Sequence, residues 1–164
     1  MGQALNNLGE LARCQGDDAT AEACYIESLA LFRSQGASVD TPRLLHNLGY
    51  VALHQGDLTR ARRLFIESLA AFRDQRSQRG VAECLAGLAA LALAQEDGTR
   101  ATRLWGAAEA LRAAAGVAMW AADRVEYERQ LAMLRAGLDE PVLADAWAAG
   151  RALTAEQAIA EALT

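Results

Sequence analysis

Residues 6–33 read NNLGELARCQGDDATAEACYIESLALFR, and residues 46–73 read HNLGYVALHQGDLTRARRLFIESLAAFR. The two stretches follow one pattern shifted by 40 positions, so that Leu8-Gly9 recurs as Leu48-Gly49. A third, weaker copy follows at the same offset and includes Trp105. A repeat of this length indicates one structural unit stacked on copies of itself. Stacked units form surfaces for partners far more often than they form catalytic centres.

Each unit has the spacing of a pair of helices. Its apolar residues recur every three or four positions, which is the helical period. In the second unit, Thr41-Pro42 predicts a helix start, with a hydroxyl cap and a proline at the first helical position. Gly56 then supplies the left-handed conformation that ends this helix, and Asp57 can cap the next one. We therefore expect two antiparallel helices joined by a short turn.

The pattern has the spacing of a known repeat. It comprises Leu5, Leu8-Gly9, Ala12, Ala21, Tyr25 and Ser28, and again Leu45, Leu48-Gly49, Ala52, Ala61, Phe65 and Ser68. This spacing resembles the tetratricopeptide repeat (TPR) signature, in which Gly9 and Gly49 would let the two helices approach closely. The period of 40 is longer than the usual value of about 34 and suggests a longer second helix.

The TPR resemblance implies an all-α fold, a right-handed α-α superhelix (TPR solenoid) of three helical hairpins with a C-terminal helical cap. The hairpins would occupy about 2–36, 42–76 and 82–115, and the cap residues 116–164. Within the cap we expect a helix over 122–136 and a short helix through Trp147 that Gly150 closes. A capping box at Thr154–Gln157 would open the last helix.

The C-terminal part carries a second, more particular resemblance. Its residues are the run Leu104–Arg112, Glu126-Tyr127-Glu128, the run Ala146–Thr154, and Glu156. They resemble the TPR-containing C-terminal end of bacterial LuxR-type transcriptional regulators and of signal-transduction ATPases with numerous domains. This resemblance implies that the chain is the C-terminal part of a larger regulator whose ATPase core precedes the repeats.

Composition excludes several classes of partner. The formal charge of −5 argues against direct binding of nucleic acid, which requires concentrated positive charge. No run of 18 apolar residues is present, so we expect no membrane span. Cys14, Cys24 and Cys84 have no metal-type spacing, and we expect reduced, buried or half-buried thiols and a cytoplasmic location.

Motifs for catalysis are missing from the sequence. It contains no glycine-rich phosphate loop ending in Lys-Ser/Thr, no His-Glu-x-x-His and no Gly-x-Ser-x-Gly. His46 and His54 are eight residues apart, too far for a zinc-binding pair on one helix. We therefore expect no enzyme activity, no cofactor and no metal site.

Partner contacts are expected on the first helix of each repeat, because in TPR arrays these helices line a concave groove. Tyr50 and Asn47 are the best contact candidates, one as an amphipathic ring and the other as an amide able to bond a peptide backbone. The apolar third repeat suggests a helix in the groove, from a partner or from the same chain. The candidate groove residues are Asn6, Asn7, Glu10, Arg13, Arg43, His46, Asn47, Tyr50, His54 and Glu83.

Two functions remain open at this stage. The first is a non-catalytic protein–protein interaction module that binds a protein or peptide in the groove, as the sensor or scaffold arm of the larger regulator. The alternative is a module for self-association or for docking on an ATPase core of the same parent protein. The first repeat, which has no N-terminal cap, favours the alternative because it presents an unpaired apolar end and could form a homo-oligomer.

Overall fold

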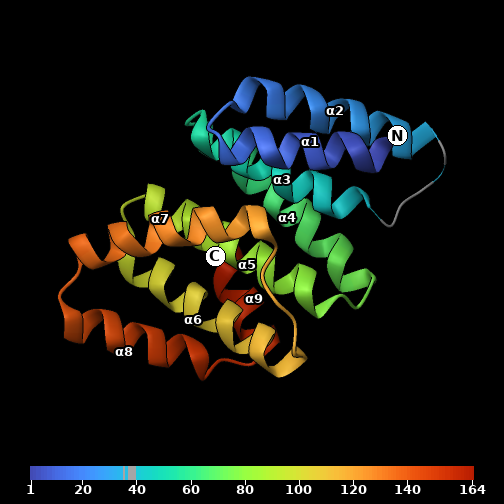
Figure 1. Ribbon diagram of the computed structural model, residues 1–164. Coiled ribbons are helices and arrows are strands. Elements are labelled where there is room, and N and C mark those ends of the chain that lie inside the picture. The colour runs from blue at the N-terminus through green and yellow to red at the C-terminus, as the bar shows by residue number, and fades with distance from the viewer. Residues whose placement is uncertain (35, 37–39) are drawn as a thin grey trace. The chain divides into compact units, whose positions relative to one another are not determined.

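In a computed structural model, the described part of the chain, residues 1–34, 36 and 40–164, contains helices and no strand (Figure 1). The prediction of an all-α, TPR-like fold is confirmed. The chain forms two compact units, Met1–Gln75 and Arg76–Thr164, which are described in turn. The repeat and cap boundaries given above stay predictions.

The first unit consists of two helical hairpins. Helix α1 packs against α2, α3 packs against α4, and α2 packs against α3. Their bounds are α1 (Gly2–Cys14), α2 (Asp18–Ser34), α3 (Thr41–His54) and α4 (Leu58–Asp74).

Glycine sets the close approach within each of these hairpins, as predicted. A Cβ atom at Gly9 would lie 2.6 Å from Cε1 of Tyr25, and one at Gly49 would lie 2.6 Å from Cε1 of Phe65. Both rings are fully buried, so they have no free space into which to move. The two helices of each hairpin can reach this distance only because position 9 or 49 has no side chain.

A buried serine repeats the same hydrogen bond in both hairpins. Ser28 Oγ donates to the carbonyl oxygen of Gly2 at 2.7 Å, and Ser68 Oγ donates to that of Pro42 at 2.6 Å. These carbonyls lie in the first turns of α1 and α3. The hydroxyl thus ties the second helix of each hairpin to the start of the first.

The turn inside the second hairpin has the predicted chemistry, but the start of α3 does not. Gly56 has φ 77°, and Asp57 Oδ1 accepts the backbone N–H of Arg60 at 2.9 Å. The expected hydroxyl cap at Thr41 is wrong. Thr41 is the first residue of α3, and the cap position belongs to Asp40, whose side chain makes no capping hydrogen bond. Proline still occupies the first turn, where its missing N–H costs nothing.

The second unit contains a third hairpin and three further helices. Helix α5 pairs with α6, and α6 also packs against α8. Residues 80–92 of α5 are buried on every side. The bounds are α5 (Gln78–Ala94), α6 (Gly98–Ala115), α7 (Ala121–Gly137), α8 (Glu140–Arg151) and α9 (Ala155–Leu163).

Gly150 was expected to close the helix that contains Trp147, and this is wrong. It lies inside α8, where it faces the backbone of α6. A Cβ at position 150 would lie 2.7 Å from the carbonyl carbon of Arg103 and closer still to its oxygen. Across the same contact, a Cβ at Gly106 would lie 3.2 Å from the backbone nitrogen of Arg151. Helices α6 and α8 therefore meet backbone to backbone.

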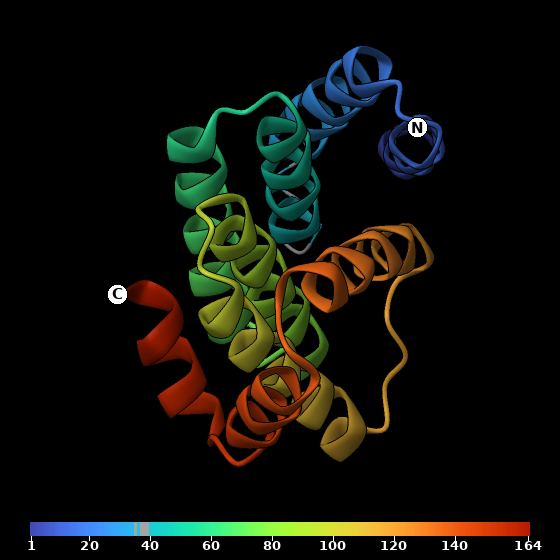
Figure 2. The ribbon, with the colours of Figure 1, turned by 90° about the vertical axis from the view of Figure 1, so that its left-hand side faces the viewer.

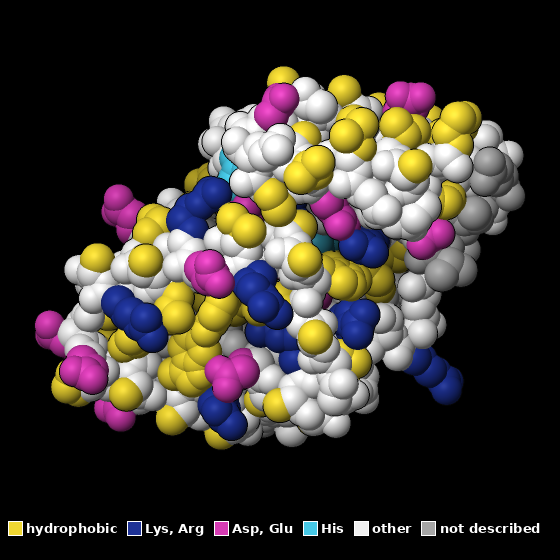
Figure 3. Space-filling model, in the orientation of Figure 1, with side chains coloured by type: hydrophobic (Ala, Val, Ile, Leu, Met, Phe, Trp, Pro, Cys, Tyr) yellow, Lys and Arg dark blue, Asp and Glu magenta, His cyan; other side chains and the backbone are white. Residues whose placement is uncertain are grey.

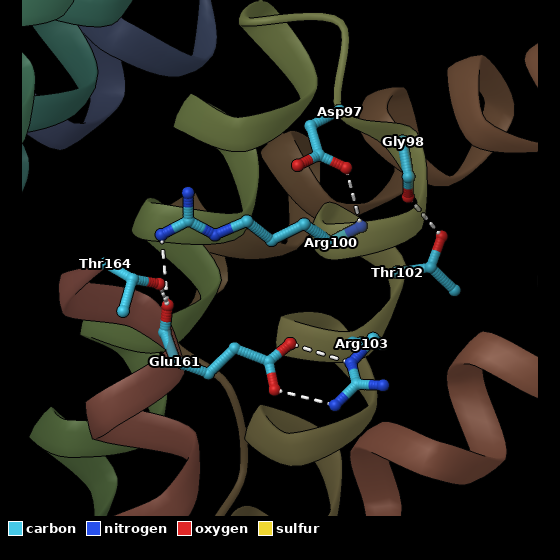
Figure 4. Close-up of polar contacts among 7 residues, drawn as sticks. All are labelled: Asp97, Gly98, Arg100, Thr102, Arg103, Glu161 and Thr164. Carbon is cyan, nitrogen blue, oxygen red and sulfur yellow. Dashed lines mark hydrogen bonds and ion pairs between the residues drawn. The ribbon is translucent and has the colours of Figure 1, made fainter.

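Helix α9 packs against α5 and α6 (Figure 2). Its start is the predicted capping box of Thr154 and Gln157, which is confirmed. Arg103 donates from Nε and Nη2 to the two carboxylate oxygens of Glu161 at 2.7 and 2.8 Å (Figure 4). Arg100 donates to the carbonyl oxygens of Glu161 and Ala162, which lie near the C-terminal end of α9.

Candidate functional site

Four of the predicted groove residues in the first unit form one hydrogen-bonded group, here called the polar cluster: Asn6 and Glu10 on α1, and Arg43 and Asn47 on α3. Asn47 Nδ2 donates to Asn6 Oδ1 at 3.0 Å and to Glu10 Oε1 at 3.3 Å. Asn6 Nδ2 donates to the same Glu10 oxygen at 3.0 Å. The cluster therefore links the first helices of the two hairpins.

Glu10 is the centre of the polar cluster. Its Oε1 accepts both amide hydrogen bonds and forms an ion pair with Arg43 Nη2 at 2.6 Å. The Glu10 and Arg43 side chains keep 17% and 29% of their surface exposed, whereas Asn6 and Asn47 are buried. A partner could thus reach the charged members of the cluster, while the amides hold the Glu10 carboxylate in position.

Tyr50 is not the surface contact that the sequence suggested. Its side chain is fully buried, and its ring meets those of His46 and Phe65 edge-on, at centroid distances of 5.1 and 5.2 Å. The Arg13 guanidinium lies over the Tyr50 ring, 4.7 Å from its centre. The prediction that Arg13, His46 and Tyr50 line an open groove is therefore corrected: an aromatic ring at a groove position satisfies its apolar surface by stacking within the unit.

The remaining predicted positions of the first unit are reachable from solvent. Asn7 is exposed and accepts a hydrogen bond from Gln3 at 3.0 Å. His54 is half-buried, and its Nδ1 lies 2.8 Å from Oδ1 of Asp18 on α2. Asn7, Glu10, Arg43 and His54 are therefore the members of the predicted set that a partner can touch directly. For Asn6 and Asn47, which are buried, the expectation of a direct contact is corrected in the same way.

Glu83, the predicted groove residue of the second unit, is also buried completely. Burial raises the pKa of its carboxyl to about 8, and the negative charge of Asp123 adds to the rise. The Arg112 guanidinium, with Nη1 3.6 Å from the Glu83 carboxylate, opposes it. Glu83 is thus a buried acid facing α6 and α7, and its predicted role as a groove contact is corrected.

Helix α7 lies against α5 in the second unit. It brings Asp123 to Glu83, and Gln130 on the same helix accepts a hydrogen bond from Trp105 Nε1 at 3.0 Å. The apolar residues of the third repeat led us to expect a helix in its groove, from a partner or from the same chain. In this unit the helix beside α5 comes from the same chain.

A cavity of about 660 Å³ lies between α7 and α8, and sequence reasoning missed it. We call it the α7–α8 cavity. Figure 3 shows it as a hollow with a hydrophobic floor and charged side chains around its edge. The only sequence signal was the apolar stripe of the predicted helix over 122–136, which did not reveal that Leu131 faces a space. The lining residues are Tyr127, Leu131, Arg135, Leu138, Glu140, Leu143, Ala144, Trp147, Ala148 and Arg151.

Two stretches of the second unit, Leu104–Arg112 and Ala146–Thr154, pack against each other. Glu109 on α6 accepts a hydrogen bond from Trp147 Nε1 at 2.8 Å and forms an ion pair with Arg151 Nη1 at 2.9 Å. Gly106 and Gly150 make the backbone contact between the same two helices. These residues join α6 to α8.

Within residues 1–34, 36 and 40–164, no group of three or more His, Cys, Asp or Glu side chains is placed to hold a metal ion. Cys24 and Cys84 are buried free thiols as expected, but Cys14 is exposed, contrary to expectation. None of the described helices is both long and apolar enough to cross a bilayer.

Residues 1–74 match the family described as Tetratricopeptide repeat. The match covers the two hairpins of the first unit and supports a TPR domain there. No curated protein and no solved structure matches the chain.

Proposed function

We propose that this chain is a non-catalytic protein–protein interaction module whose first unit binds a protein or peptide partner at Asn7, Glu10, Arg43 and His54. TPR repeats generally mediate interactions between proteins, and the family match lies over this unit. The observation that carries the proposal is the polar cluster. A carboxylate held by two buried amides and a half-exposed arginine is a positioned pair of opposite charges on the first helices of both hairpins.

The polar cluster favours a partner that presents a donor to Glu10 and an acceptor to Arg43. An extended peptide offers both along its backbone and side chains. Because the buried amides of Asn6 and Asn47 both donate hydrogen bonds to Glu10, we assign them a positioning role. We assign Arg13, His46 and Tyr50 a structural one.

The test uses affinity capture from a lysate of the source organism with quantitative mass spectrometry. Asn7→Arg places a bulky cation beside Glu10 without disturbing a buried group, since Asn7 is exposed. Glu67→Arg on the exposed side of α4 is the matched control. We expect proteins that are enriched by the wild type and by Glu67→Arg but lost with Asn7→Arg. Equal enrichment with all three baits would contradict a partner site at the polar cluster.

A second candidate is self-association through the first unit. Leu8 and Leu11 on α1 are 49% and 55% exposed, and Ile26 on α2 is 51% exposed. Figure 3 shows hydrophobic side chains spread over the surface of α1 and α2. Large exposed aliphatic residues gathered on two adjacent helices are typical of an association surface. Sedimentation velocity on the wild type, Leu11→Glu and the control Val142→Glu would decide: a dimer lost only in Leu11→Glu supports self-association, and a wild-type monomer rules it out.

We also propose, from the resemblance of its C-terminal stretches, that the chain is the sensor or scaffold arm of a larger cytoplasmic bacterial transcriptional regulator or signalling ATPase. In that setting the module could instead dock on the ATPase core of its own parent protein. The sequence of the coding DNA upstream of Met1 tests whether the chain is part of such a larger protein. A continuous reading frame that encodes a phosphate-binding loop supports it, and a stop codon directly upstream contradicts it.

A further inference from the structure

The α7–α8 cavity has the size and lining of a site for a small molecule. Small-molecule sites enclose roughly 300–1,000 Å³ and are mostly apolar with a few convergent polar groups. This cavity measures about 660 Å³, and both of its walls belong to the second unit. It lies outside the polar cluster and serves none of the contacts proposed above.

The apolar part of the cavity is preformed. Leu131 and Leu138 line it from the α7 side, and Leu143 and Trp147 line it from α8. The indole of Trp147 is fixed by its hydrogen bond to Glu109, and the backbone contact at Gly150 fixes α8 itself. A ligand would therefore meet walls that need little ordering, which lowers the entropic cost of binding.

The polar part of the cavity is rich in donors. In the portion of the chain that the structure describes, Arg135 has no ion-pair partner. Arg151 pairs with Glu109 through one guanidinium nitrogen, so its other N–H groups remain available, and the Tyr127 hydroxyl is a further donor. The lining contains one carboxylate, that of Glu140, to oppose these donors. A ligand with acceptor oxygens and a negative charge best satisfies such a wall.

We propose that the α7–α8 cavity binds a small amphiphilic anion, a molecule with one alkyl or aromatic body and one carboxylate-like group. The body lies between Leu131, Leu143 and Trp147, and the anionic group pairs with Arg135. Glu140 opposes the anion and limits the affinity. The ligand is a free molecule and not a lipid within a bilayer, because the exposed charged side chains of Arg135, Glu140 and Arg151 lie in the lining of the cavity.

The test compares three ligands of equal chain length on the intact chain: decanoate, decanol and decylamine. Isothermal titration calorimetry measures the affinity of each ligand. In NMR spectra, a shift of the indole N–H signal of Trp147, assigned with Trp147→Phe, shows that the ligand binds in the cavity. We expect decanoate to bind most tightly, decanol more weakly and decylamine most weakly. Equal affinities, or no shift of the Trp147 signal at millimolar decanoate, would overturn the proposal. Vesicles of phosphatidylglycerol should not capture the chain, and co-sedimentation with them would overturn the assignment to a free ligand.

Variants separate the anion from the apolar body. Arg135→Gln should weaken decanoate binding about fivefold, the value of an exposed ion pair, and leave decanol binding unchanged. Glu140→Gln should strengthen decanoate by a similar factor. Leu131→Trp fills the cavity and should abolish binding of both ligands. Met133→Trp, two residues along α7 at a 53% exposed position outside the cavity, is the matched control and should bind normally. Unchanged decanoate affinity in both Arg135→Gln and Leu131→Trp would refute the site.

Discussion

Replacement of Gly150 by alanine should destabilise the second unit, because the added methyl group would penetrate the backbone of α6. The new Cβ would lie 2.7 Å from the carbonyl carbon of Arg103, whereas carbon atoms normally approach to about 3.5–4.0 Å. Helix α8 must therefore withdraw by about 1 Å, and the obstacle is a main-chain group that cannot rotate away. Overpacking of this kind costs about 1–3 kcal/mol, and a backbone obstacle places it near the upper end.

Alanine in a helix gains about 0.5–1 kcal/mol over glycine, so the net loss in free energy of unfolding should be about 2 kcal/mol. For a chain of this size that corresponds to a fall of roughly 6 °C in Tm. Thermal denaturation followed by circular dichroism measures it. Gly137→Ala is the control, since no atom lies within 4 Å of its added Cβ, and its Tm should stay within about 2 °C of wild type. If Gly150→Ala has the same Tm as Gly137→Ala, the backbone contact between α6 and α8 does not exist as described.

Two further substitutions have predictable effects. Glu96 has φ 65° at the turn position where Gly16 and Gly56 have φ 78° and 77°, so Glu96→Gly should raise the free energy of unfolding by about 0.5–1 kcal/mol in urea titrations. Glu96→Ala should bring no gain, and a gain in both variants would point to the lost charge instead. Glu83 has a raised folded-state pKa, so its contribution to stability is complete below the ordinary carboxyl pKa of 4.5 and is lost as pH rises toward 8. Glu83→Gln should therefore match wild type near pH 4.5 and exceed its free energy of unfolding by on the order of 5 kcal/mol near pH 8.5. Parallel pH profiles of the two proteins would show that Glu83 is not a buried acid.

The sequence predicted the hairpins because their determinants are local and repeated. Gly9 and Gly49 lie at the same position in two copies, each opposite an aromatic residue, so the register identifies them as packing positions. The turn at Gly56-Asp57 follows from backbone conformation and one hydrogen bond, which neighbouring residues decide. Such features need no knowledge of distant contacts.

The solvent exposure of individual side chains could not be predicted from the sequence in the same way. The repeat register states which face of a helix a residue occupies, but not what covers that face. Tyr50 is buried by edge-on contact with Phe65 and by the Arg13 guanidinium over its ring, and Glu83 is buried beside α7, a helix that lies outside the repeat pattern. Gly150 was misassigned because glycine serves equally to end a helix and to allow a close approach, and only the position of α6 distinguishes these uses.

The contact of Gly106 and Gly150 also determines which properties of the α7–α8 cavity can change during evolution. Main-chain atoms have the same size in every sequence, so this contact holds α8 at the same distance from α6 whichever side chains stand at Leu131, Leu143 or Arg135. Substitutions at Leu131, Leu143 or Arg135 would alter which ligands the cavity binds and leave the position of α8 unchanged. The fold therefore fixes the position of α8 independently of these three side chains, and a chain that keeps both glycines can change what the cavity accepts without moving that helix.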